Sequence, residues 1–474
     1  MIRMKRAFAV VLAACLLLGL GMAEEVVSDF SALSWSDAFS QLHGRLAREY
    51  AFTDWKGVDW AALGDEFGPR IRDAEAASDF EAYYLALREY VHAIPDGHVR
   101  AGNLPEIDDK HIGGGFGFCV AALDDESAIA AWVDEGSPAF AAGLRAGDEL
   151  LTWNGEPVGS ALSAVSPIFD GNAATAENLR QKQAAYLARA PVGEELLLTF
   201  RSESGETNSA ALTAYADGGL SLKKAYPDAV LADPIRALIL GVESPDPLPE
   251  KMVEWKLLDG NVGYIRVWGE VDADLQDTGA LVSTLQLFRD AVRSAVDHGC
   301  GALIVDLRNN IGGEDAMAAA MLGCLCPEKT FYEYQNAYDP ATGALGIQGE
   351  LWIEPFEPVF PGKIVALVNQ KCVSSGEGVA MGIRNLLNGE TLGFFGTNGS
   401  FGLCGPEAQM PGGVSVHWPS GQSLDENKQI QLDSRDGVGG VEPTVRVPMT
   451  RENALRVAAG EDVELSEALR MLNS

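Results

Sequence analysis

The sequence predicts a multidomain α/β protein, and three observations lead to that fold class. The chain has 474 residues, which is more than one hydrophobic core organises, so two or three domains are expected. From Trp35 to about Val91, apolar residues recur at helical steps of three and four. After about residue 251, apolar strand-like runs alternate with helical stretches, which is typical of a layered domain with parallel strands.

The N-terminus has the composition of a targeting segment. Residues 1–23 begin with basic side chains, continue with the apolar run Ala7 to Leu20 and end in small residues before two glutamates. This order is typical of a secretory signal peptide cleaved near Ala23, and the run is shorter than the roughly 20 residues that a membrane span needs. The stretch before Cys15 also resembles a lipoprotein box, but the apolar run continues past it, which favours simple secretion. We therefore expect an extracytoplasmic protein, which is secreted, periplasmic or on the cell surface.

Composition argues against several classes of function. The chain is 47% hydrophobic and 22% charged, as in ordinary globular proteins, and its formal net charge is -33. Such an acidic chain repels nucleic acid and anionic lipid, so neither is expected as a partner. No second segment is apolar enough for a stable membrane span after signal cleavage. No zinc-ribbon spacing occurs among the later cysteines, so we predict no metal or other cofactor and leave disulfide pairing open; they are Cys119, Cys300, Cys324, Cys326, Cys372 and Cys404.

An N-terminal helical region is expected over residues 24–110. Phe39, Leu42 and Leu46 follow one another at steps of three and four, and a second series of the same kind follows. A turn signal at residues 94–97 ends this second series.

A β-rich segment is expected over residues 111–215. It opens with a run of glycines and phenylalanines, and continues with Gly-Ser-Pro-Ala at 136–139 and Ala-Gly-Asp-Glu-Leu-Leu at 146–151. At this spacing the segment resembles a PDZ domain. The resemblance implies that backbone N–H groups of the opening loop hold the C-terminal carboxylate of a peptide, which adds as a strand. The peptide-binding residues so predicted are Gly115, Phe116, Gly117 and Phe118.

A linker is expected over residues 216–250, because the stretch from Ala225 to Glu250 contains five prolines. Beyond it, residues 251–474 are expected to form the α/β domain. Two loops of this domain, 306–313 and 369–377, each follow a strand-like apolar run. Ligands and chemistry gather at the carboxyl ends of strands in such domains, so these loops are the candidate site.

The second of these loops carries a candidate nucleophile. Ser374 stands where a strand turns into a helix, a place that presents a hydroxyl above the positive end of the helix dipole. The backbone N–H groups of Gly312 or Gly313, together with that of Ser375, are candidates for an oxyanion hole. Each loop alone has a plainer interpretation, since serine is common at helix caps and paired glycines commonly form turns.

Taken together, these features are similar to those of the C-terminal processing, or tail-specific, peptidases and of the tricorn protease core. The similarity covers nearly the whole mature chain: the helical start ending in Asp96-Gly97-His98, the PDZ-like insertion and the two loops. It implies a serine peptidase whose catalytic domain has the ClpP/crotonase-like α/β fold. It also assigns the nucleophile to Ser374 rather than Ser375.

Members of this family use either a lysine or a histidine as the base. Lysine-type members carry it in a turn that corresponds here to residues 396–403, which contain no lysine, and Lys371 matches no family lysine. The tricorn-like branch takes a histidine from the N-terminal region, and His98 matches that position. An ordinary histidine pKa of about 6.5 suits a general base at neutral pH. The alternative is that His98 only caps its turn.

The third catalytic residue is expected among the acidic residues shortly before Gly440. The resemblance favours Asp436, with Asp433 as the second candidate, although no glutamate stands where the family has one. Each aspartate is also compatible with an ordinary turn residue.

These assignments predict acyl transfer, in which His98 takes the proton of Ser374, the serine attacks a peptide carbonyl, and water releases the acyl-enzyme. The expected substrates are proteins or peptides, recognised in part through their C-termini. Two alternatives stay open: a catalytically inactive peptide- or ligand-binding protein on the same fold, and a crotonase-like acyl-CoA enzyme. The second alternative would not explain the signal peptide and the PDZ-like segment.

Overall fold

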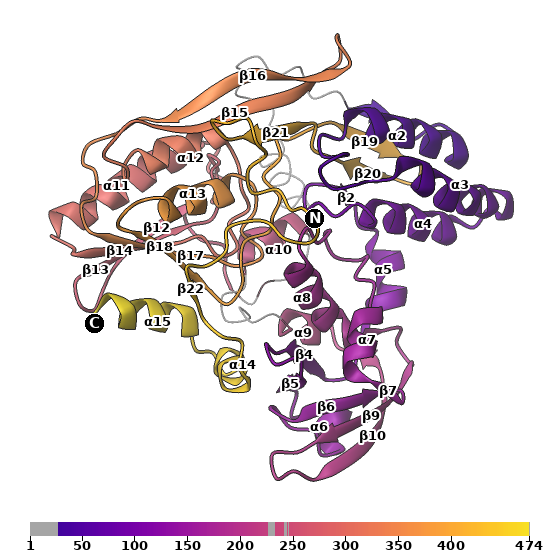
Figure 1. Ribbon diagram of the computed structural model, residues 1–474. Helices are drawn as coiled ribbons and strands as arrows, with labels where there is room; N and C mark the ends of the chain where they lie inside the picture. Colours follow the sequence, from indigo (N-terminus) through magenta and orange to yellow (C-terminus); the bar gives the residue numbers. More distant parts are fainter. Residues whose placement is uncertain (1–26, 226–232, 241–243, 245, 474) are drawn as a thin grey trace. The chain divides into compact units, whose positions relative to one another are not determined.

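The computed structural model of the chain (Figure 1) describes residues 27–225, 233–240, 244 and 246–473. The predicted signal peptide, with Cys15, lies outside the described residues. Within the described part, none of the helices has the length and apolar character needed to cross a membrane. The chain forms two compact units, one made of residues up to 101, 233–447 and 464 onward, the other of 102–232 and 448–463.

The first unit is built on a six-stranded sheet. All neighbouring strands are parallel except for the first pair, which is antiparallel. The order across the sheet is β12 (Val253–Leu258), β13 (Val262–Val267), β14 (Ala302–Asp306), β17 (Lys363–Leu367), β18 (Gly389–Gly393) and β22 (Val445–Arg446). Both faces of the central strands are buried, which is why their sequences read as continuous apolar runs rather than as alternating ones.

Helices cover one face of this sheet. Leu303 and Val305 of β14 face a core that includes α11 (Thr284–Asp297), α12 (Asp315–Leu322) and α13 (Ser375–Arg384). These three helices lie together on one side of the strands in Figure 1. Each follows the carboxyl end of a strand or leads to the next one, as parallel pairing requires.

Polar side chains occupy the opposite face of the same strand. Asp306, at the end of β14, is fully buried and accepts hydrogen bonds from Arg308 and from the Tyr264 hydroxyl. Arg308 in turn donates to Glu464 at 2.9 Å, at the start of α15 (Val463–Leu472). A buried charge is tolerated when it is paired in this way, and the pairing anchors the loop that starts at residue 306.

The N-terminal helices belong to the first unit rather than to a domain of their own. They are α2 (Trp35–Glu49), α3 (Trp60–Ala77) and α4 (Phe80–His92), whose N-caps are Ser34, Asp59 and Asp79. Two N-terminal strands, β1 (Ser28–Asp29) and β2 (Arg100–Ala101), pair with β19 (Glu407–Met410) and β20 (Val414–His417) in one small sheet. This pairing places the turn at residues 94–98 among C-terminal segments. A further sheet joins β16 (Ala344–Ile353), β15 (Thr330–Asp339) and β21 (Gly421–Leu424).

The second unit has a five-strand path in the order β10, β9, β6, β5, β4, so β4 is an end strand. Its core includes Phe116, Phe118, Leu198 and Phe200. The strands are β3 (Gly114–Gly115), β4 (Phe118–Ala122), β5 (Ala128–Val133), β6 (Glu149–Trp153), β7 (Glu156–Pro157), β8 (Arg189–Ala190), β9 (Glu195–Arg201), β10 (Thr207–Thr213) and β11 (Tyr215–Ala216). The helices are α5 (Pro105–Ile112), α6 (Pro138–Ala141), α7 (Val158–Ala164), α8 (Ala176–Leu187), α9 (Leu220–Lys223) and α14 (Arg451–Ala458).

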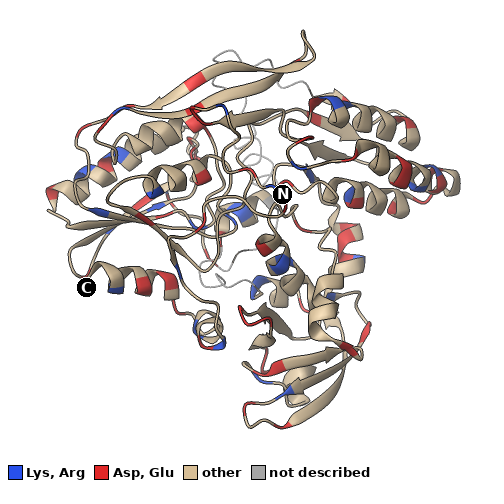
Figure 2. Ribbon diagram, viewed as in Figure 1, with Lys and Arg blue, Asp and Glu red and all other residues tan. Residues whose placement is uncertain are grey.

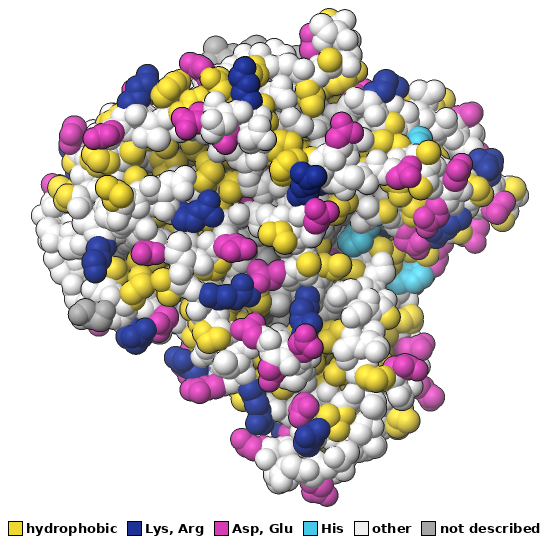
Figure 3. Space-filling view, viewed as in Figure 1, with side chains coloured by type: hydrophobic (Ala, Val, Ile, Leu, Met, Phe, Trp, Pro, Cys, Tyr) yellow, Lys and Arg dark blue, Asp and Glu magenta, His cyan; other side chains and the backbone are white. Residues whose placement is uncertain are grey.

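The stretch expected to be a linker, residues 216–250, contains ordered elements. Besides α9, the helix α10 (Pro234–Leu240) forms within it, while residues 226–232, 241–243 and 245 are outside the described part. The acidic residues that dominate the composition are spread over the elements of both units (Figure 2), and on the face in Figure 3 they lie among hydrophobic and basic side chains.

Candidate active site

Ser374 stands at a sharp turn between β17 and α13. Its backbone has φ 58° and ψ -132°, a conformation that is costly for a residue with a side chain and that clusters at functional sites. Its N–H donates to the carbonyl of Ser400 at 3.0 Å and to the carboxylate of Glu377 at 3.2 Å. The side chain is partly exposed, directly before the first turn of α13. The hydroxyl of Ser374 is thus presented at a helix N-terminus, where developing negative charge is favoured.

Ser375 has a different role from its neighbour. Its side chain is fully buried, and its hydroxyl lies 2.8 Å from both the carbonyl of Gly313 and a carboxylate oxygen of Asp315. Burial raises the pKa of Asp315 to about 6, opposed by the bond to Ser375. The hydroxyl of Ser375 therefore ties α13 to the glycine loop, and Ser374 is the serine of this pair that a substrate can reach.

Glu377 ties together the two loops around Ser374. Its carboxylate is fully buried and accepts hydrogen bonds from the Thr397 hydroxyl at 2.6 Å and from the N–H groups of Gly399 and Ser400 at 2.8 and 3.0 Å. Burial raises its pKa to about 7, opposed by these donors. The stretch 396–403, which lacks the lysine of lysine-type relatives, is thus held against Ser374 by a glutamate.

Ser400 connects Ser374 to the turn that carries His98. Its carbonyl accepts from the N–H of Ser374, and its hydroxyl accepts from the N–H of Gly97 at 2.8 Å. A Cβ on Gly97 would come within 2.3 Å of the side-chain oxygen of Asn398, so the two loops approach as closely as only glycine allows. His98 and Ser374 are therefore brought to the same fully buried residue although 276 positions separate them in the sequence.

His98 is kept in its neutral form by its surroundings. Its side chain is 18% exposed, and its Nδ1 lies 3.7 Å from a carboxylate oxygen of Asp96. Burial lowers the pKa of His98 to about 4; Asp96 opposes this, while the charges of Arg100 and Lys56 add to it. The imidazole is thus unprotonated at neutral pH, as a general base must be.

The carboxylate beside His98 is Asp96 and not the predicted Asp436. Asp96 is fully buried, and the oxygen that faces the ring also accepts the backbone N–H of His98 at 2.9 Å. The side chain of Asp436 is 95% exposed and lies 3.9 Å from Arg435. The second candidate, Asp433, is buried and lies 3.7 Å from Lys56, which is itself 3.6 Å from Asp96. Among these three aspartates, Asp96 is therefore the one that the structure places beside His98, while the side chain of Asp436 is exposed to solvent.

The glycine loop packs directly on the nucleophile's turn. A Cβ on Gly312 would lie 2.7 Å from that of Ser374, and one on Gly313 would lie 2.2 Å from the carbonyl of Glu270. The N–H of Gly312 donates to the Asn310 side chain at 2.8 Å. Within the described residues, no acceptor is found for the N–H groups of Gly313 and Ser375. These two amides are the ones left to bind an oxyanion, while Gly312 provides the close approach.

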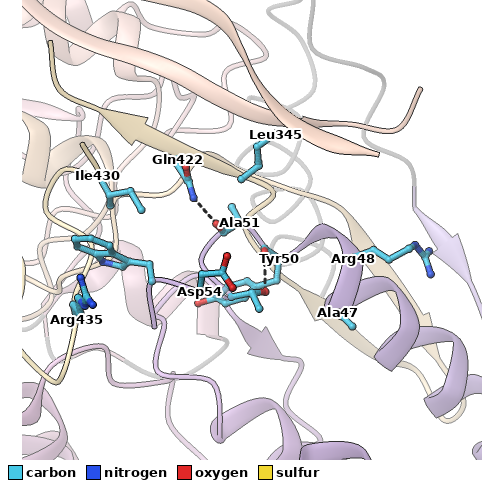
Figure 4. Close-up of a pocket in the computed structure, with 11 residues that line it drawn as sticks. Ala47, Arg48, Tyr50, Ala51, Asp54, Leu345, Gln422, Ile430 and Arg435 are labelled. Carbon is cyan, nitrogen blue, oxygen red and sulfur yellow. Dashed lines mark hydrogen bonds between the residues drawn. The ribbon is translucent and has the colours of Figure 1, made fainter. Parts of the chain in front are cut away.

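A pocket of about 430 Å³ is lined by residues that include Tyr50, Asp54 and Arg435 (Figure 4). Tyr50, whose hydroxyl donates to Asp96 at 2.8 Å, forms part of its wall. So does Trp55, whose indole N–H donates to the carbonyl of Asp433 at 3.0 Å. Two residues of the pocket wall thus make hydrogen bonds to Asp96 and to the backbone of Asp433.

In the second unit, the predicted peptide-binding loop is occupied by the chain itself. All four residues from Gly115 to Phe118 are buried. A Cβ on Gly115 would lie 2.4 Å from the carboxylate of Asp217, which is held by Arg189 at 2.8 Å and by the Ser221 hydroxyl at 2.6 Å. A carboxylate of the chain thus lies at the loop that was predicted to receive the carboxylate of a peptide.

The segment after Asp217 also covers the end strand β4. The helix α9 contacts β4, and the Cys119 thiol donates to the carbonyl of Lys224 at 3.0 Å. Leu222 packs with Cys119 and with Ala185 of α8 in one apolar cluster. Leu222 and Lys224 therefore pack against the face of β4 that carries Cys119, on the strand to which an added peptide was expected to pair.

Several site residues were missed by sequence reasoning. Lys56 belongs to no motif, and Ser400 lies in the stretch 396–403 that was compared with the family's lysine turn but was not singled out there; their roles come from the three-dimensional contacts. Asp96 lies in the same motif as His98, and Glu377 lies in the same loop as Ser374, but neither acidic residue was assigned a role. Their place in those motifs was the available signal.

Comparison with known proteins matches the profile of Peptidase family S41 to residues 261–447. No curated protein sequence matches the chain. Among solved structures, mature CPAF complexed with lactacystin has 15% sequence identity and a TM-score of 0.63, covering 93% of this chain and 97% of that one. A peptidase candidate from Parabacteroides merdae ATCC 43184 has 15% identity and a TM-score of 0.50, with 93% and 97% covered. At such identities the likeness shows a shared fold.

Proposed function

We propose that the chain is a serine-type peptidase of family S41, whose profile matches residues 261–447, with Ser374 as its nucleophile and His98 as its general base. The observation that carries this assignment is Ser400, which accepts one hydrogen bond from Ser374 and another from the residue before His98. The strained backbone of Ser374 is independent support.

The reaction is acyl transfer to the serine and then to water. His98 accepts the hydroxyl proton as Ser374 attacks the peptide carbonyl, and the N–H groups of Gly313 and Ser375 stabilise the oxyanion. The imidazolium gives its proton to the leaving amine, and Asp96 stabilises that cation meanwhile. Water then attacks the acyl-enzyme with His98 again as base, which restores the free serine and releases the new carboxylate.

The second unit acts in substrate binding on this proposal. Its end strand β4 and the loop from Gly115 to Phe118 would take up the C-terminal residues of a protein or peptide substrate. Because Asp217 lies against Gly115, that uptake requires the segment 217–225 to move aside. The substrate class is therefore unstructured polypeptide with a free C-terminus.

We also place the mature enzyme outside the cytoplasm. This rests on the sequence pattern of residues 1–23, with its basic start, apolar run and small residues before the acidic mature N-terminus.

The test is cleavage of casein by purified residues 24–474, beside Ser374→Ala and His98→Ala, with fluorophosphonate labelling of each. We expect the parent to cleave casein and to label, and Ser374→Ala to do neither. His98→Ala should lose roughly 10²–10⁴-fold in rate, as expected for removal of a general base. Absence of both cleavage and labelling in the parent would favour a binding protein on this fold.

A further inference from the structure

Beneath His98 lies a buried cluster of charges, defined as Tyr50, Lys56, Asp96 and Asp433. The side chains of Lys56, Asp96 and Asp433 are 1%, 0% and 0% exposed. Lys56 donates to the carbonyl of Pro95 at 3.0 Å and lies between the two carboxylates, 3.6 Å from Asp96 and 3.7 Å from Asp433. Such complete burial of three ionisable groups is expensive and requires pairing.

One ammonium cannot neutralise two carboxylates, so the cluster must hold an additional proton or carry a net negative charge. The two aspartates are not equivalent in this respect. Asp96 accepts hydrogen bonds from the Tyr50 hydroxyl at 2.8 Å and from the N–H of His98 at 2.9 Å. Asp433 accepts one from the N–H of Phe401 at 3.2 Å, and its other oxygen has no hydrogen-bond partner among the described residues. A carboxylate with fewer donors is the better place for a proton.

The surrounding charges point the same way. Burial raises the pKa of Asp433 well above its ordinary value, Lys56 opposes this, and the negative charges of Asp96 and Glu377 add to it. For Asp96, burial is outweighed by Lys56 and His98, so its pKa is lowered. Arg100 is a further cation that acts on His98.

We propose that Lys56 and Asp433 are positioning residues of the peptidase reaction: Lys56 keeps Asp96 ionised beside His98, and Asp433 carries the proton that the buried cluster requires. The inference rests on the proposed function, since it assigns the protonation state of Asp96, the carboxylate that stabilises the imidazolium of His98. In the resting enzyme, Lys56 balances the charge of Asp96 and His98 stays neutral. When His98 takes the proton of the serine, Asp96 is already charged and in place, 3.7 Å from Nδ1.

The sharpest test is Lys56→Met, with kcat and KM measured from about pH 5 to pH 9. Without its cation, Asp96 becomes protonated at neutral pH, so kcat should fall by roughly 10²-fold or more while KM changes little. The acid limb of kcat should move to higher pH, because Asp96 must now ionise without help. The matched control is Lys363→Met, which removes an exposed lysine of the same unit.

A second variant separates this electrostatic role from a structural one. Lys56→Arg keeps a cation at this position, and we expect it to retain at least tenfold more kcat than Lys56→Met and to hold the acid limb at lower pH. If Lys56→Met does not fold, two other variants test the proposal. Asp96→Asn should lower kcat at least tenfold more than Asp433→Asn does, because an amide imitates a protonated carboxyl and not an ionised one.

Two outcomes would overturn the inference. One is an equal loss of kcat in Lys56→Met and Lys56→Arg at every pH, which would make Lys56 a structural residue only. The other is an equal effect of Asp96→Asn and Asp433→Asn. Failure of the proposed function itself looks different, because the parent would then show neither casein cleavage nor fluorophosphonate labelling, or cleavage would persist in Ser374→Ala.

Discussion

The pH dependence of Ser374 reactivity follows from the burial of His98. With the pKa of about 4 that burial imposes, roughly 90% of the imidazole is neutral at pH 5, whereas an ordinary pKa of about 6.5 would leave roughly 3% neutral. Lowering the pH from 7.5 to 5 should therefore reduce the rate of Ser374 labelling by less than about twofold. An unperturbed histidine would reduce it about 30-fold.

The assay is the second-order rate of fluorophosphonate labelling at the two pH values. A labelling reagent is preferable to a protein substrate, because its own ionisation does not change over this range. Far-ultraviolet circular dichroism at each pH checks that the chain stays folded, and Ser374→Ala supplies the background. A tenfold or larger fall in rate with intact folding would refute the argument that burial keeps His98 neutral.

The same shift predicts how stability depends on pH. The pKa of His98 is lower in the folded state than its ordinary 6.5, so the unfolded chain binds the additional proton as pH falls. The stability that the folded state has while His98 is neutral in both states is fully present above about pH 6.5, and it is lost as the pH falls toward 4. At pH 5 the loss is about 2 kcal/mol, from 1.36 kcal/mol per pH unit. The free energy of unfolding in urea should therefore fall by about 2 kcal/mol more for the parent than for His98→Gln when the pH is lowered from 7.5 to 5. If the difference between the two proteins stayed constant with pH, the assignment would be contradicted.

Three further predictions test the loops and the second unit. Gly312→Ala should lower kcat roughly 10²-fold or more, because its Cβ would lie 2.7 Å from that of Ser374, whereas Gly343→Ala, at a similar φ but with no neighbour within 4 Å, should keep its kcat. Ser375→Ala should cost about 1–3 kcal/mol in urea unfolding yet still label at Ser374, and loss of labelling with normal stability would reverse the roles of the two serines. Asp217→Ala should raise the affinity for a dye-labelled peptide with a free C-terminus about tenfold or more, measured by fluorescence anisotropy against the amidated peptide; unchanged affinity would contradict displacement of the segment.

Local pattern was sufficient for the parts of the site that lie within one loop. The positions of Ser374 and of the paired glycines follow from where apolar strand runs end, because a parallel sheet brings its carboxyl ends to one edge. The capping glutamate Glu377 also stands within the same turn as the serine it supports.

The choice among acidic residues could not be made in the same way. Asp433 and Asp436 are three positions apart, yet one side chain is 0% exposed and the other 95%. Asp436, with a positive φ, lies in the turn between the paired residues Arg435 and Val438, whereas Asp433 precedes that turn. A resemblance that is uncertain by a few residues cannot resolve such a turn.

From the sequence alone came the α/β class, the resemblance to a peptidase family and the proposals for Ser374 and His98, because each depends on residue types at short spacings along the chain. Only the tertiary structure decided which carboxylate faces His98, and that Lys56 and Asp433 lie behind it. Their charges act across contacts of 3.6 to 3.7 Å between segments up to 377 residues apart. Electrostatic coupling at this range depends on burial and distance in space, which no spacing along the chain encodes.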